Sequence, residues 1–88
     1  MKGELAEALA DCTQAIRIDP LIADAYSQRG LIWAAQGDVI KAISEYSQAI
    51  RLDPRNAATF LNRGNAWVAM GKHLSLFIVN NWFLKISV

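Results

Sequence analysis

Few residues of this 88-residue chain are of the types that do chemistry in proteins. It has one cysteine, Cys12, and one histidine, His73, so it can form neither an internal disulfide nor a Cys/His metal site. His73 follows Lys72 at the expected start of a helix, where we expect an exposed or capping side chain. These residues predict no catalytic, metal or cofactor site.

Three acidic residues come close together near the start of the chain. Glu4, Glu7 and Asp11 are spaced by three and four residues, and in a helix they share one face. That face is opposite the apolar one, so we expect solvated carboxylates rather than an acid–base pair. The sequence therefore does not predict an enzyme.

Tryptophans are the third group to consider, because aromatic rings can stack on nucleic-acid bases. The formal charge is only +1 and no basic stripe accompanies them, so we expect no nucleic-acid partner. Trp33 and Trp67 are 34 residues apart, which favours a repeated core position. Trp82 has no assigned place.

The 34-residue spacing extends through most of the chain. The string AIRIDP at 15–20 recurs as AIRLDP at 49–54. The longer segments that contain these strings, 3–20 and 37–54, share eight identical residues in 18. Residues 23–37 and 57–71 share six identities in 15. A fixed period of this size is typical of a solenoid built from one repeated unit.

Each unit is predicted to contain two helices. We expect helices near 4–18, 23–36, 39–52 and 57–70. In the third of these, apolar or small residues recur on one face: Val39, Ala42, Ile43, Tyr46, Ala49 and Ile50. In the first, the same face carries Leu5, Ala8, Leu9, Cys12, Ala15 and Ile16. Cys12 takes the place of Tyr46, which predicts a buried, unreactive thiol.

Turn residues separate these helices. Gly37 suits a left-handed C-terminal position and Asp38 suits a helix cap. Asp53-Pro54 should end the third helix, because proline lacks an N–H. On the outer face of that helix, Lys41 and Glu45 are four residues apart, and we expect them to pair weakly.

Glycines within two helices predict close packing. A mid-helix glycine costs about 1 kcal/mol relative to alanine, so Gly30 and Gly64 should mark close helix–helix approaches. We expect Gly30 to face Ala42 on the neighbouring antiparallel helix.

At these positions the chain resembles the tetratricopeptide-repeat family. The complete unit matches the family pattern at Tyr26, Gly30, Trp33, Ala42, Tyr46, Ala49 and Pro54. The resemblance implies an all-α fold of antiparallel helix hairpins stacked as a short right-handed α-solenoid. The resemblance covers about residues 3–72, and it implies a repeat region at 1–72 with a half unit at 3–22, a full unit at 23–56 and the first half of a third at 57–72.

The family resemblance implies a non-catalytic module that binds a peptide segment of another protein on its concave surface. The corresponding strip on the first helix of each hairpin contains Ser27, Gln28, Leu31, Ala35, Leu61, Asn62, Asn65 and Ala69, bordered by Ala34 and Val68. It has no lysine or arginine, so we expect no clamp for a C-terminal carboxylate. The alternative is a structural or truncated piece of a larger repeat protein without its own ligand.

The repeat pattern stops at residue 72. Residues 73–88 form an apolar tail that predicts a diverged last helix, an accidental addition to a cut repeat array, or a membrane-binding or partner-binding segment; a β-hairpin ranks below a helix. About 20 apolar residues are needed to span a bilayer, so we expect no membrane span, although the tail should favour self-association. No signal peptide is evident and no disulfide is possible within the chain, which fits the cytoplasm.

Overall fold

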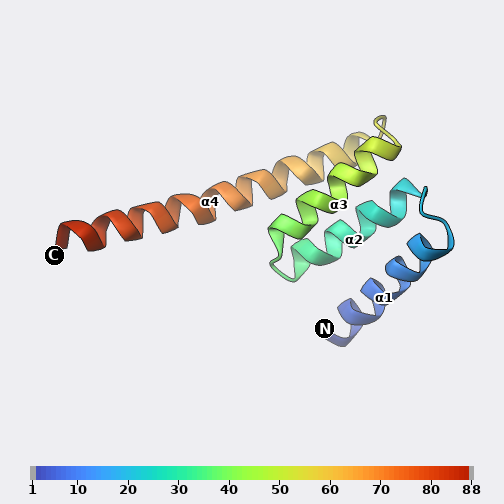
Figure 1. The fold of residues 1–88 in the computed structure, drawn as a ribbon, viewed down its shortest axis with the longest axis horizontal. Coiled ribbons are helices and arrows are strands. Elements are labelled where there is room, and N and C mark those ends of the chain that lie inside the picture. The colour runs from blue at the N-terminus through green and yellow to red at the C-terminus, as the bar shows by residue number, and fades with distance from the viewer. Residues whose placement is uncertain (1, 88) are drawn as a thin grey trace.

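The computed structural model describes the backbone of residues 2–87 and the side chains of residues 3–72. Within that range the chain forms four helices and no strand: α1 (Lys2–Ile18), α2 (Ala23–Ala35), α3 (Val39–Leu52) and α4 (Ala57–Ser87) (Figure 1). The predicted all-α fold is confirmed. Helices α1 to α3 have nearly the predicted bounds, whereas α4 is much longer than expected.

The turns form as the sequence predicts. Gly37 has a φ of 85°, in the left-handed region, and the Asp38 carboxylate accepts a hydrogen bond from the Lys41 N–H at 3.1 Å. Asp19 and Asp53 each accept a hydrogen bond from the N–H two residues later, at 3.0 and 3.1 Å. The aspartate before each proline thus fixes the same turn in both repeats.

The core lies where α2, α3 and α4 meet. Ala42, Ile43 and Tyr46 of α3 are buried against Ala66 of α4, with Trp33, Val39 and Met70 packed around them. Ala49 is buried as well, so most of the predicted apolar face of α3 is inside the protein. The spacing of apolar and polar residues therefore predicted the buried face of this helix correctly.

Helix α1 is less covered. Among the described residues it packs against α2 alone, and every member of its apolar face is only half-buried. Cys12 is therefore half-buried, and the prediction that it is buried was wrong. The reason is that α1 has a neighbour on one side only.

Gly30 allows the close approach of α2 and α3, but not against the predicted residue. A Cβ atom at Gly30 would lie 2.6 Å from Cε1 and 2.8 Å from Cδ1 of the Tyr46 ring. The glycine therefore makes room for an aromatic ring, and the expected contact with Ala42 was wrong. Tyr46 is almost fully buried at this place, and its burial raises the pKa of the phenol.

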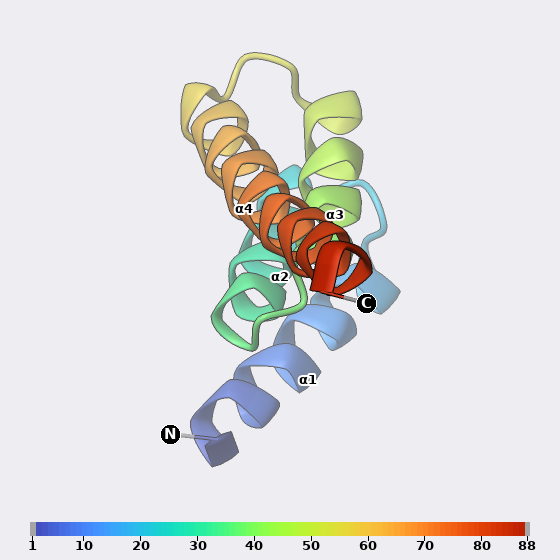
Figure 2. The same ribbon diagram turned by 90° about the vertical axis from the view of Figure 1, so that its left-hand side faces the viewer.

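Helix α4 does not end at residue 70, as we expected. It continues through Gly71 to Ser87, and its C-terminal half projects away from the other three helices (Figures 1 and 2). Gly71 does not have a positive φ, and Lys72 stands where Asp38 caps α3. Without these two stop signals the helix propagates, so the β-hairpin alternative was wrong and the predicted boundary at residue 72 falls inside a helix.

The continuous helix leaves part of α4 without a partner. A Cβ atom at Gly64 would meet nothing within 4 Å, and Trp67 is 51% exposed. The predictions of a close approach at Gly64 and of a core position for Trp67 were therefore wrong. Both required a returning helix, which a straight α4 cannot supply.

Candidate functional site

One face of α2 forms the first half of the predicted strip. Gln28, Leu31 and Ala35 are exposed on it, and so is Ala34 at its border. The spacing of three and four residues places Gln28, Leu31 and Ala35 along one line of the helix surface. Asp24, one turn before Gln28, lies on the same line and is also exposed.

The second half of the strip lies on α4 at positions shifted by one 34-residue repeat. Asn65 is exposed, while Asn62 and Ala69 are half-buried. These residues are the repeat equivalents of Leu31, Gln28 and Ala35. The strip thus carries two amides on α4 and one on α2, together with small and apolar side chains.

A buried hydrogen bond connects the two helices beneath the strip. The hydroxyl groups of Ser27 on α2 and Thr59 on α4 lie 3.1 Å apart, and both residues are buried. We expected Ser27 to line the binding surface, and that was wrong, because its side chain holds α2 against α4. A buried hydroxyl needs such a partner, since leaving it unpaired costs about 1–3 kcal/mol.

Leu61 is the repeat equivalent of Ser27 on α4. It is 67% exposed, and the neighbouring Val68 is similarly exposed. Because Ser27 faces the helix of the following repeat, Leu61 occupies the position that would face a further repeat. Leu61 therefore lies beside the strip rather than on it.

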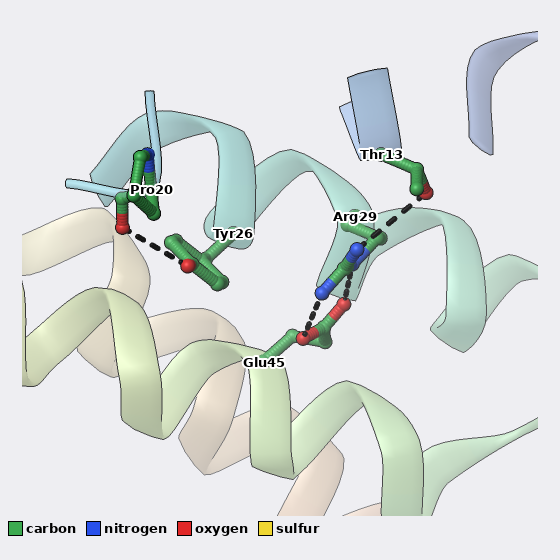
Figure 3. Close-up of polar contacts among 5 residues, drawn as sticks. All are labelled: Thr13, Pro20, Tyr26, Arg29 and Glu45. Carbon is green, nitrogen blue, oxygen red and sulfur yellow. Dashed lines mark hydrogen bonds and ion pairs between the residues drawn. The ribbon is translucent and has the colours of Figure 1, made fainter. Parts of the chain in front are cut away.

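The arginines near the strip are held away from it. Arg29 of α2 donates from Nε and Nη2 to the two carboxylate oxygens of Glu45 on α3, with the Nη2 contact at 3.1 Å (Figure 3). On its other side, Nη1 lies 3.5 Å from the Thr13 hydroxyl of α1. The hydrogen bonds to Glu45 raise the pKa of the Arg29 guanidinium, although its partial burial opposes this.

This geometry corrects the predicted pairing of Lys41 with Glu45. Glu45 is bound to Arg29 instead, and Lys41 lies 3.7 Å from the Asp38 carboxylate. The Lys41 ammonium also sits 4.3 Å above the centroid of the Trp33 ring. A two-pronged guanidinium–carboxylate pair is more favourable than a weak pair at helical spacing, which explains the exchange.

Arg63 repeats part of the arrangement in the next unit. Its Nη1 donates to the Ser47 hydroxyl at 3.1 Å, and Ser47 is the repeat equivalent of Thr13. The position equivalent to Glu45 is Val79, which has no carboxylate. Both arginines therefore point toward the second helix of the preceding unit, and the strip has no cation of its own.

Two features were missed by reasoning from sequence. One is Asp24, whose spacing of four from Gln28 places it on the strip. The other is the contact between an arginine and a hydroxyl 16 residues earlier, made by Arg29 with Thr13 and by Arg63 with Ser47. The signal was present, since both pairs recur at the 34-residue period.

A separate depression of about 270 Å³ lies between α1, α2 and α3. It is lined by Leu9, Thr13, Arg29, Trp33, Lys41, Ser44 and Glu45. Of the charged groups there, Arg29 and Glu45 are paired with each other, and Lys41 is paired with Asp38 outside the depression. Within the described part of the chain, no cluster of three His, Cys, Asp or Glu residues is placed to hold a metal ion.

The remaining reactive or acidic side chains singled out in the sequence lie on α1. Glu4, Glu7 and Asp11 are exposed, as predicted. Burial raises the pKa of the Cys12 thiol, although the charge of Arg29 opposes this. In the range that the structure describes, no helix is both long enough and apolar enough to cross a membrane.

Comparison with protein families gives a match to part of the chain. Residues 30–71 match the family model described as TPR repeat, and they include the last turns of α2, all of α3 and the first half of α4. No curated protein matches the chain. Repeats of this family generally mediate protein–protein interactions and are typically not enzymes. The matched model, the 34-residue period and the paired helices together support assigning the repeat region of this chain to the tetratricopeptide-repeat family.

Proposed function

We propose that the chain binds an extended peptide segment of another protein along the strip formed by Gln28, Leu31 and Ala35 of α2 and by Asn62, Asn65 and Ala69 of α4. The observation that supports this most directly is the equivalence of the two halves. The same three positions are wholly or partly accessible in successive repeats, and the buried Ser27–Thr59 hydrogen bond holds the two helices together.

The chemistry of the strip favours a peptide backbone as its ligand. Each amide of Gln28, Asn62 and Asn65 offers two N–H donors and one carbonyl acceptor, which match the alternating N–H and C=O groups of an extended chain. Leu31 offers an apolar contact beside them. Because successive repeats stack, the equivalent positions of α2 and α4 can contact successive residues of one bound peptide.

The charges on the strip indicate which peptides would bind there. The strip has the Asp24 carboxylate at one end and no cation, since Arg29 is bound to Glu45 and Arg63 to Ser47. A terminal carboxylate would find no ion pair there. We therefore expect neutral or weakly basic segments, bound through internal backbone and apolar groups.

The test is a binding screen against an array of extended peptides that vary in charge, with hits measured in solution by calorimetry. The double variant Asn62→Ala/Asn65→Ala should weaken a specific hit at least tenfold. Gln14→Ala, which removes an exposed amide from α1, is the control and should leave the affinity unchanged. Equal loss in both variants, or no peptide bound above background, would favour a structural role without a ligand.

A further inference from the structure

Helix α4 carries a second surface that the proposed peptide site does not use. Phe60, Gly64, Trp67 and Gly71 follow one another at intervals of four, three and four residues, which places them on one stripe of the helix. Phe60 is 43% exposed and Trp67 51% exposed, and nothing lies within 4 Å of a Cβ atom at either glycine. This stripe is apolar and unpartnered within the described part of the molecule.

In the preceding repeat the same stripe is better covered, with its central glycine buried and its two aromatic residues half-buried. Its equivalents on α2 are Tyr26, Gly30, Trp33 and Gly37, and Gly30 is packed against Tyr46 of α3. The stripe on α4 therefore lies where the second helix of a third hairpin would pack. The described residues do not fill this place, because α4 runs straight on: position 78 is about 21 Å beyond Gly64 along the helix axis.

The positions of this stripe along α4 lie at equal distances on either side of Gly71, which is the spacing that two antiparallel copies need. Continuing the stripe with helical spacing reaches Ser75, Ile78 and Trp82, which lie four, seven and eleven residues after Gly71. Trp67, Gly64 and Phe60 lie four, seven and eleven residues before it. None of these seven positions carries a charge.

We propose that the stripe is an interface between two copies of this chain, whose α4 helices pair antiparallel about a two-fold axis at Gly71. Residues 72–87 of each copy then occupy the place that a third hairpin would fill on the other copy. Glycine at the axis lets the two backbones approach closely. The pairing sets Trp67 opposite Ser75, Gly64 opposite Ile78 and Phe60 opposite Trp82, so that large groups meet small ones near the centre.

This arrangement is closed. A two-fold interface uses the same patch on both copies and covers both patches at once, so it predicts a dimer and no larger species. Each α4 is about 46 Å long, and Gly71 lies fourteen residues after its first residue and sixteen before its last. The two helices therefore overlap over nearly their whole length. The peptide strip lies on a different face, so this interface does not depend on the proposed function.

Sedimentation of the full chain over a wide concentration range measures the association. We expect a monomer–dimer equilibrium, and Trp67→Lys should weaken it at least tenfold with an unchanged far-UV helix signal. Ile40→Lys is the matched control, because Ile40 is an apolar residue of α3 that is 72% exposed and off the stripe. It should leave the dimer intact.

Cross-linking tests the antiparallel register without relying on a disruptive variant. In a Cys12→Ala background, Gly64→Cys and Ile78→Cys should react with a short bismaleimide to give dimers only when the two variants are mixed. Cross-linking of Gly64→Cys to itself would indicate parallel helices and overturn the proposal. A monomer at every concentration, or open-ended aggregation in place of a dimer, would also overturn it.

Discussion

At the scale of single residues, the two repeats show that an identical residue has different energetic roles in different surroundings. Gly30 and Gly64 occupy the same repeat position. The first lies under the ring of Tyr46, while the second meets open space. The effect of a glycine on stability therefore depends on which side chain of the neighbouring helix packs against it.

The glycines give the first prediction. Gly30→Ala should lower the free energy of unfolding by about 1–3 kcal/mol, because the new methyl group would force the buried Tyr46 ring to move. Gly64→Ala should instead raise it by up to about 1 kcal/mol, since alanine favours the helix and has room. Urea unfolding at protein concentrations below self-association measures both. A loss of stability in both variants would contradict the packing described for α4.

The second prediction concerns Arg29 and Glu45, whose side chains are 21% and 12% exposed. Glu45→Ala should destabilise the fold by about 1–3 kcal/mol, because it leaves a charged donor partly buried without its acceptor. The double variant Arg29→Ala/Glu45→Ala should cost less than the sum of the two single changes, which a double-mutant cycle measures.

A surface pair is the control for that cycle. Arg55 and Asp53 lie 3.5 Å apart, but the Arg55 side chain is 91% exposed. Their coupling should be at most about 1 kcal/mol, since solvent screens exposed charges. Equal coupling in the two pairs would show that burial does not strengthen the Arg29–Glu45 pair.

At the scale of helices, start and stop signals determine where the chain turns. Between α2 and α3 the left-handed Gly37 and the capping Asp38 act together. At the equivalent place in α4 a glycine is present without a cap, and the helix continues. In this protein, a glycine without a following capping residue does not end the helix.

The third prediction tests the cap. Asp38→Ala should lower the free energy of unfolding by about 0.5–2 kcal/mol, because the Lys41 N–H loses its acceptor. Asp24→Ala is the comparison, since Asp24 is also in the first turn of a helix but makes no capping bond there. Thermal unfolding should show a clear decrease for the first variant and a small one for the second. Two equal decreases would indicate a general charge effect instead of capping.

At the scale of the whole molecule, the layers of helices are unequally covered. Helix α3 has neighbours on two sides, α2 and α4, whereas α1 packs against α2 alone. The apolar face of α1 is half-buried throughout, while four residues of α3 are buried. Local stability should follow this difference, because opening a less covered helix exposes less apolar surface.

Hydrogen exchange followed by mass spectrometry provides the fourth prediction. Backbone amides of α3 should exchange at least tenfold more slowly than those of α1 under native conditions. The same ranking should hold in the Trp67→Lys variant, where self-association is weakened, since it derives from packing within one chain. Equal protection of the two helices would mean that the chain unfolds only as a single cooperative unit.

The sequence by itself determined the repeat, the bounds of the first three helices and the inner face of α3. These depend on local signals that lie within one helix or one turn: the period of 34, the spacing of apolar residues, Gly37-Asp38 and the Asp-Pro pairs. The face of α2 that carries Gln28, Leu31 and Ala35 was predicted for the same reason. Helical spacing alone puts those residues on one line.

Only the tertiary structure decided which neighbour each residue meets. Ser27 was assigned to a binding surface but bonds to Thr59, and Glu45 was assigned to Lys41 but binds Arg29. Both outcomes depend on how close a second helix comes, which no single helix encodes. The same holds for Gly64 and Trp67, whose exposure follows from α4 running straight past Gly71, because a residue is buried only when another part of the chain arrives to cover it.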